Sequence, residues 1–107
     1  MYVYSMALGT SGIIKVGYTN DVARRAGEHG RRYGCPKQVT ILSAVKFTSK
    51  ITAEAMETQL IEACKAAGLQ MVRDLQNGTT ERFYMNDSIE TVTIKARKLT
   101  YEIRVRA

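Results

Sequence analysis

The sequence predicts an α/β fold of the α+β type, with a small three-stranded antiparallel sheet flanked by helices in the order β-β-α-β-α-(short β)-α. A chain of 107 residues suits one domain, and a hydrophobic fraction of 45% is enough for one core. Segments rich in β-branched and aromatic residues alternate with segments whose apolar residues recur at helical spacing. No repeat or linker interrupts them, so we expect a single domain over residues 1–107 with its core at about 2–85.

The strands are predicted from β-branched and aromatic content. Residues 2–8 and 13–18 form the two arms of a hairpin, because the intervening Gly9-Thr10-Ser11-Gly12 supplies the positive φ angles of a tight turn. Residues 39–47 make the third strand, and residues 81–85 make a short extended piece.

Two helices are bounded by capping signals. The first follows the capping oxygens of Thr19-Asn20-Asp21 and continues to about Tyr33, before Gly34. The second opens at Thr48-Ser49 and ends at about Ala67, before Gly68. Apolar residues at three- and four-residue spacing predict its buried stripe: Ala53, Met56, Leu60, Cys64 and Ala67.

The C-terminal segment carries two conflicting patterns. Asp87-Ser88-Ile89-Glu90 resembles a capping box and the apolar residues that follow keep a helical stripe, which predicts a basic helix over about 88–105. Leu99, Tyr101 and Ile103 also alternate as in a strand, so both structures stay open for residues 99–106.

Composition limits the class of protein. The formal net charge of +6 suggests a polyanionic partner, nucleic acid being the commonest, although such a charge also serves solubility alone. Two cysteines, Cys35 and Cys64, and a single histidine do not support a disulfide framework or a structural zinc site, and we expect reduced thiols in a cytoplasmic protein. No segment suggests a signal peptide or contact with a membrane.

Cationic residues concentrate in the first third of the chain. Arg25 and His29 are four residues apart and share one face of the first helix, and three further arginines add positive charge to it: Arg24, Arg31 and Arg32. Lys15 lies within a strand, where it either points outward or lines a site. Gly17 either allows close approach of a backbone or a phosphate, or is a plain turn residue.

Three other side chains could take part in chemistry. Glu57 borders the core stripe of the long helix, where it is either a rim residue or a single carboxylate ligand of Mg²⁺. Glu54 lies on roughly the same side of that helix and Glu62 projects elsewhere. Tyr4 and Tyr18 are candidate proton carriers, although each could simply be packed.

Together these segments resemble the GIY-YIG nuclease superfamily over residues 2–85. Tyr2-Val3-Tyr4 stands where Gly-Ile-Tyr is usual, and Lys15-Val16-Gly17 where Tyr-Ile-Gly is usual. The run from Gly17 to His29 follows the family pattern, and the helix around Glu57 looks like the one that brings the metal-binding glutamate. A phage and bacterial branch of the family has lysine in place of the second-motif tyrosine and a Glu-Trp-Phe-like segment, which resembles Glu81-Arg82-Phe83-Tyr84.

The resemblance implies a metal-dependent DNA endonuclease that hydrolyses phosphodiester bonds with one Mg²⁺ or Mn²⁺ held by Glu57. The implied catalytic residues are Tyr4, Lys15, Arg25, His29 and Glu57, and the implied DNA contacts are Lys15, Tyr18, Arg24, Arg31 and Arg32. Cutting both strands would need a homodimer or two successive nicks. Because Lys15 removes a phenol that the family often uses to activate water, a catalytically weak or inactive module that binds DNA or a protein is the alternative.

Overall fold

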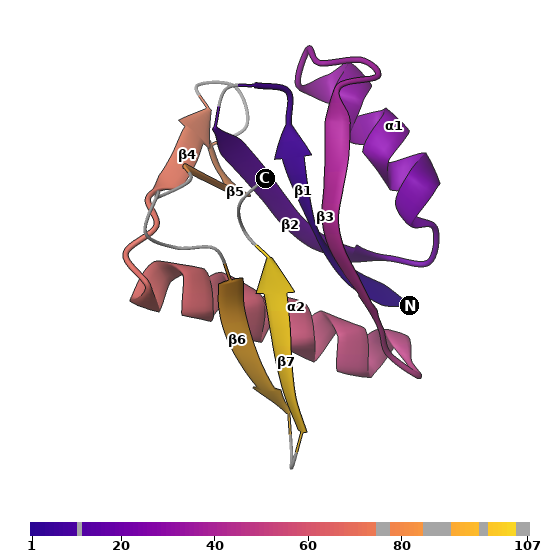
Figure 1. The fold of residues 1–107 in the computed structure, drawn as a ribbon, viewed down its shortest axis with the longest axis vertical. Helices are drawn as coiled ribbons and strands as arrows, with labels where there is room; N and C mark the ends of the chain where they lie inside the picture. The colour runs from indigo at the N-terminus through magenta and orange to yellow at the C-terminus, as the bar shows by residue number, and fades with distance from the viewer. Residues whose placement is uncertain (11, 75–77, 85–90, 97–98, 105–107) are drawn as a thin grey trace.

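The fold is built on a five-stranded antiparallel sheet with one helix on each face. A computed structural model describes residues 1–10, 12–74, 78–84, 91–96 and 99–104. Its elements, in chain order, are β1 (Tyr2–Leu8), β2 (Ile13–Thr19), α1 (Val22–Arg32), β3 (Val39–Lys46), α2 (Lys50–Ala66), β4 (Met71–Asp74), β5 (Gly78–Tyr84), β6 (Thr91–Ala96) and β7 (Leu99–Arg104). The sheet order is β3-β1-β2-β5-β4, and β6 and β7 form a separate two-stranded sheet (Figure 1).

The predicted elements of the first two thirds of the chain are confirmed. β1 and β2 form the expected hairpin, with Tyr2 opposite Thr19, and both turn glycines, Gly9 and Gly12, have positive φ. Asp21 caps α1 and Ser49 caps α2, each side chain accepting a hydrogen bond from a backbone N–H in the first turn.

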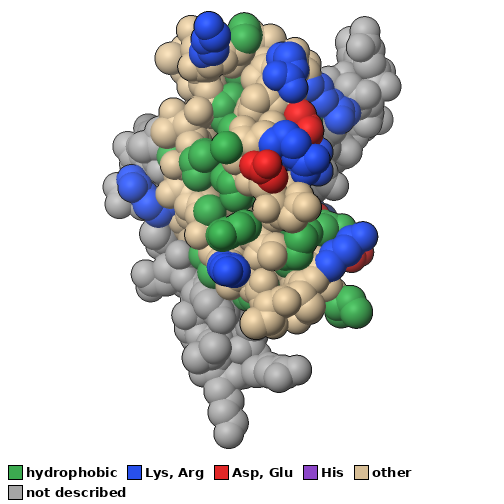
Figure 2. All heavy atoms as spheres, turned by 90° about the vertical axis from the view of Figure 1, so that its right-hand side faces the viewer, with side chains coloured by type: hydrophobic (Ala, Val, Ile, Leu, Met, Phe, Trp, Pro, Cys, Tyr) green, Lys and Arg blue, Asp and Glu red, His purple; other side chains and the backbone are tan. Residues whose placement is uncertain are grey.

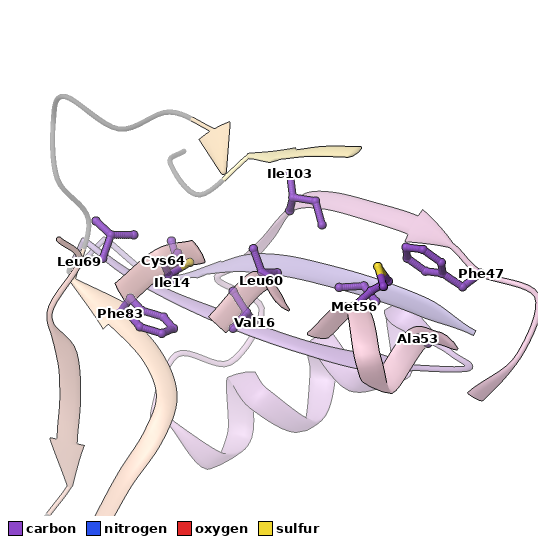
Figure 3. Close-up of a cluster of buried hydrophobic side chains, with 11 residues drawn as sticks. Ile14, Val16, Phe47, Ala53, Met56, Leu60, Cys64, Leu69, Phe83 and Ile103 are labelled. Carbon is purple, nitrogen blue, oxygen red and sulfur yellow. The ribbon is translucent and has the colours of Figure 1, made fainter. Parts of the chain in front are cut away.

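The main core lies between the sheet and α2. Alternate residues of the strands point toward α2, among them Val3, Ile14, Val16 and Phe83, all fully buried. The helix contributes Ala53, Met56, Leu60 and Cys64, which confirms four of the five residues of the predicted stripe, whereas Ala67 is only half-buried at the C-cap. Figure 3 shows these side chains on one side of β1 and β2, with α1 on the other.

The sheet is larger than the three strands predicted. The short extended piece is the end of β5, which pairs with β2 and with β4. β4 has only four residues and little local signal, so its strand structure comes from pairing with β5. The fold class is as predicted, while the strand count is corrected.

The predicted C-terminal helix over about 88–105 is wrong within the described residues. β6 and β7 form an antiparallel hairpin in which Val92 lies opposite Ile103 and Ile94 opposite Tyr101. β-Branched residues are frequent in β6, which favours extended backbone, and alternation carries Ile103 into the main core, where it is fully buried. The backbone oxygen of Arg104 also accepts a hydrogen bond from the buried Ser5 hydroxyl of β1. This hairpin covers α2 and part of the sheet (Figure 1).

Candidate active site

A cavity of about 590 Å³ lies beside β2, at the point where β5 stops pairing with it. β5 pairs only with Ile13–Lys15, whereas the five consecutive residues from Val16 to Asn20 line the cavity. The other lining residues come from the N-terminus, from β1 and β2, from α1 with its C-cap residue, and from α2. They are Met1, Tyr4, Lys15, Arg24, Arg25, His29, Arg32, Tyr33, Lys50 and Glu57. The cavity is therefore shared by α1 on one face of the sheet and α2 on the other.

All five predicted catalytic residues line this cavity, namely Tyr4, Lys15, Arg25, His29 and Glu57. Of the predicted DNA contacts, Tyr18, Arg24 and Arg32 line it as well. Arg31 lies outside it, on a smaller hollow with Lys37. Glu54 and Glu62 are exposed on α2 and are not among the lining residues.

Tyr4 and His29 form the buried centre of the site. Tyr4 is 2% exposed and His29 is 6% exposed, and the Tyr4 Oη lies 2.7 Å from the His29 Nε2. Tyr4 lies directly opposite Gly17 in the β1–β2 pairing. A Cβ atom at Gly17 would lie 2.4 Å from the Tyr4 Oη, so glycine at this place within β2 allows the close approach of the phenol.

His29 is neutral at physiological pH. Burial, reinforced by the positive charges of Lys15, Arg25 and Arg32, lowers the pKa of His29 from 6.5 to about 4. A neutral imidazole carries one N–H and one acceptor nitrogen. Its Nε2 can therefore accept the hydrogen bond that the Tyr4 hydroxyl donates when the proton of the ring resides on Nδ1.

Lys15 lines the site, which resolves the alternatives left open by the sequence. It is only 9% exposed, and its strand neighbours Ile14 and Val16 face the opposite side of the sheet. In the β2–β5 pairing it lies across from Arg82, which is also buried. Two cationic side chains thus extend from adjacent strands toward the face of the sheet that carries α1.

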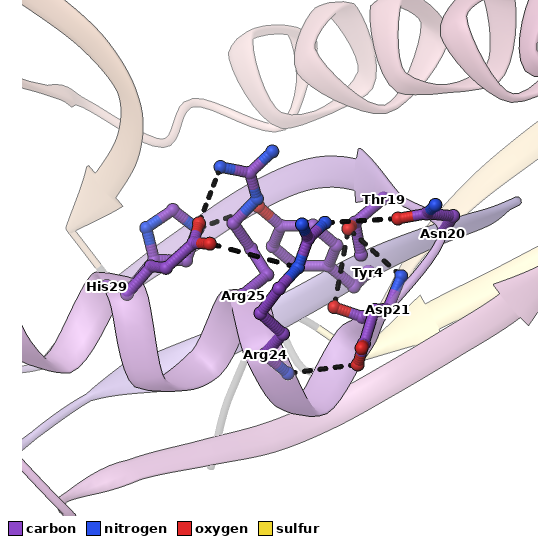
Figure 4. Close-up of polar contacts among 8 residues, drawn as sticks. Tyr4, Thr19, Asn20, Asp21, Arg24, Arg25 and His29 are labelled. Carbon is purple, nitrogen blue, oxygen red and sulfur yellow. Dashed lines mark hydrogen bonds and ion pairs between the residues drawn. The ribbon is translucent and has the colours of Figure 1, made fainter.

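The N-terminal half of α1 is fixed by a local hydrogen-bond network (Figure 4). The Asp21 carboxylate accepts a hydrogen bond from the Arg24 backbone, and the Arg24 guanidinium donates one to Asn20. Arg25 donates a hydrogen bond of 3.0 Å to Glu28. On the face that includes α1, lysine and arginine side chains are spread with carboxylates among them (Figure 2).

Several site residues were missed by sequence reasoning. Glu28 is three residues from Arg25, a spacing that predicts an ion pair on a helix. Tyr33 lines the cavity, stacks on His29 with ring centroids 5.7 Å apart, and carries the Arg82 guanidinium over its ring. Lys50 lines the cavity from the start of α2. No local signal marks Tyr33, Arg82 or Lys50, because their roles depend on how distant segments pack.

The carboxylates of this cavity decide how many protein ligands a divalent cation would find there. Among the described residues no group of three histidine, cysteine, aspartate or glutamate side chains could enclose a metal ion. Glu57 is the one carboxylate among the described residues that line this cavity. Mg²⁺ keeps most of its waters and takes one or two carboxylates, which fits this site.

The fold and site define an α+β domain with a strongly cationic cavity built around a buried tyrosine, a histidine and one carboxylate. The model of the T5orf172 domain family matches residues 1–98, and the chain belongs to that family, which is associated with endonucleases of the GIY-YIG and HNH-like kinds. No curated protein and no solved structure matches the chain. Neither of the described helices is long and apolar enough to cross a membrane.

Proposed function

We propose that this protein is a metal-dependent DNA endonuclease of the GIY-YIG type, which hydrolyses phosphodiester bonds at the cavity beside β2. One observation carries the proposal. Tyr4, Lys15, Arg25, His29 and Glu57 come from four elements of the fold and line the same cavity. A cation, a proton-transfer pair and a carboxylate that can hold a metal ion are groups that can together catalyse the hydrolysis of a phosphodiester.

The cations of the cavity bind the phosphodiester. Arg25 and Lys15 supply N–H donors to the nonbridging oxygens, where negative charge grows in the transition state. The Arg25 Nη1 donates a hydrogen bond to Glu28, and Arg25 lines the cavity. Tyr18, Arg24 and Arg32 extend the positive surface along the DNA backbone.

Tyr4 and His29 move the proton of the attacking water. The Tyr4 Oη accepts that proton while its own proton passes to the His29 Nε2, 2.7 Å away. Because the pKa of His29 is lowered, the imidazole is unprotonated at neutral pH, and after accepting the proton it releases it to solvent. The leaving 3′ oxygen takes a proton from solvent.

Glu57 is the residue that would hold Mg²⁺ or Mn²⁺. The bound ion would supply Lewis-acid stabilisation of the scissile phosphate and of the leaving oxygen. Glu57 is half-buried on α2 and lines the cavity, whereas its neighbour Glu54 is exposed.

A module that binds DNA with little or no cleavage is the second candidate. The observation that favours it is Lys15, a buried cation at the place of the second-motif tyrosine. Such a module would use the same cavity to hold phosphates, and its affinity would fall steeply with salt.

The test compares Glu57→Gln with the matched control Glu54→Gln. Supercoiled plasmid is incubated with each protein and Mg²⁺ or Mn²⁺, and nicked and linear products are quantified on a gel. We expect Glu57→Gln to lower the cleavage rate by about a hundredfold or more, since several kcal/mol of charge stabilisation depend on the ion and each 1.36 kcal/mol is tenfold in rate. Glu54→Gln should cleave as the wild type does.

One result would contradict the metal site, and another would contradict the endonuclease activity itself. Cleavage by Glu57→Gln at the wild-type rate would show that Glu57 does not hold a catalytic metal ion. Wild-type protein that binds DNA in a salt-dependent way without nicking it in either metal would favour the binding module instead.

A further inference from the structure

Tyr33 stands at the boundary between two cavities. It is the C-cap residue of α1 and lines the main cavity, and it also lines a smaller one of about 250 Å³. Arg82 lines the smaller cavity and is not among the lining residues of the main one. The endonuclease mechanism assigns no part to either residue.

A continuous set of contacts joins Arg82 to the proton-transfer pair. The Arg82 guanidinium carbon lies 4.2 Å from the centroid of the Tyr33 ring. The Tyr33 and His29 rings are stacked with 5.7 Å between centroids and 28° between planes. The His29 Nε2 in turn lies 2.7 Å from the Tyr4 Oη. These four side chains come from β5, α1 and β1, so the contacts span distant segments of the chain.

Arg82 is itself held firmly. It is 8% exposed on β5, and the next residue, Phe83, is fully buried in the main core. A guanidinium stacks well on an aromatic face because it is planar and weakly hydrated, and the attraction is stronger away from water. The Tyr33 ring therefore contacts a buried guanidinium from β5 and a buried imidazole from α1.

We propose that Tyr33 and Arg82 are positioning residues that orient the His29 ring so that its Nε2 faces the Tyr4 hydroxyl. The inference rests on the proposed function and deepens it. One hydrogen bond fixes a single atom of the imidazole and leaves rotation of the ring about that contact. Stacking against Tyr33 removes that freedom, and Arg82 keeps Tyr33 in place from the neighbouring strand.

The test combines kinetics with nuclear magnetic resonance of the chain's one histidine. The variants are Tyr33→Leu and Arg82→Met, with Tyr33→Phe as the conservative variant that keeps the ring. Tyr84→Leu is the matched control, because Tyr84 is an exposed tyrosine on the same strand as Arg82. The ¹⁵N shifts of His29 report which ring nitrogen carries the proton, whether or not the protein cleaves DNA.

We expect Tyr33→Leu and Arg82→Met to lower kcat by about 10- to 100-fold, the effect of misaligning a reacting group by a fraction of an ångström to 1 Å. KM for DNA and its salt dependence should stay unchanged. His29 should show one tautomer, protonated on Nδ1, in the wild type, Tyr33→Phe and Tyr84→Leu. It should show mixed tautomers in Tyr33→Leu and Arg82→Met.

Three results would overturn the inference. The first is an unchanged His29 spectrum in folded Tyr33→Leu and Arg82→Met. The second is a raised KM with a smaller salt slope, which would make Arg82 a DNA contact. The third is full loss of kcat in Tyr33→Phe. If the wild type cleaves no DNA, the proposed function fails, but the spectra still decide whether this stack orients His29.

Discussion

Replacing Gly17 by alanine is the sharpest structural perturbation of the site, because the added methyl would meet the phenol of Tyr4. An ideal Cβ would lie 2.4 Å from the Tyr4 Oη, 2.7 Å from its Cζ and 3.1 Å from its Cε2. Ordinary contact begins at 3.4 Å, so the ring has to retreat by about 1 Å. That retreat breaks the 2.7 Å contact with the His29 Nε2.

The size of the effect follows from two costs and one gain. Overpacking a buried site costs about 1–3 kcal/mol, and leaving a buried hydrogen-bonding group unpaired costs about 1–3 kcal/mol. Replacing a strand glycine by alanine raises the free energy of unfolding by about 0.5–1 kcal/mol, because the unfolded chain then has fewer backbone conformations to lose on folding. We therefore expect Gly17→Ala to lower the free energy of unfolding by about 3 kcal/mol.

A double-mutant cycle with Tyr4→Leu, followed by urea denaturation, isolates the contact. Leucine lacks the Oη, Cζ and Cε2 atoms that the methyl would meet, so Gly17→Ala should be neutral or stabilising in that background, giving a coupling of about 3 kcal/mol. The control is Gly27→Ala on α1, whose Cβ would meet only the Arg31 guanidinium at 3.5 Å. Gly27→Ala should stabilise the protein by up to about 1 kcal/mol. The reasoning is refuted if Gly17→Ala destabilises equally with and without the Tyr4 ring, or if it leaves stability unchanged.

Two further outcomes concern titration. The pKa of His29 is lowered in the folded protein, so the unfolded chain binds its proton first as the pH falls and stability decreases between pH 6.5 and 4. The loss of unfolding free energy should reach about 3 kcal/mol at the lower end of that window, from 1.36 kcal/mol per pKa unit, and should vanish in His29→Gln. Urea denaturation midpoints of both proteins across the window would show it. The same pH dependence of stability in the wild type and in His29→Gln would contradict it. Burial raises the pKa of the Cys64 thiol to about 12. We therefore expect Cys64 to resist alkylation by iodoacetamide in the native protein and to react when the protein is unfolded. Mass spectrometry would detect the alkylated residue. Rapid native labelling at Cys64 would show that α2 does not pack as described.

The elements of the first two thirds of the chain could be predicted because their signals are local. Asp21 and Ser49 cap the helices with their own side chains, and Gly34 and Gly68 adopt the positive φ expected after a helix end. The β1–β2 hairpin follows from its turn glycines. In each case the deciding interaction lies within a few residues of the signal.

The candidate site was predictable in part. Arg25 and His29 share a helix face by spacing alone, whereas Glu57 was chosen over Glu54 by the family resemblance, since both lie on roughly the same side of that helix. Tyr33 and Arg82 gave no such signal, since their contact joins the end of α1 to β5. The roles of these residues in catalysis remain predictions.

By itself, the sequence determined the fold class, the two helices with their caps, the first three strands, and which chemical groups the first third of the chain carries. Only the tertiary structure decided the rest. Residues 99–104 carry a stripe that suits a helix and an alternation that suits a strand, and pairing with β6 and burial of Ile103 against the core select the strand. Likewise, the phenol of Tyr4 reaches His29 only because Gly17 leaves room for it on the neighbouring strand. Local patterns cannot encode such choices, because their free energy comes from surfaces that meet only after the chain has folded.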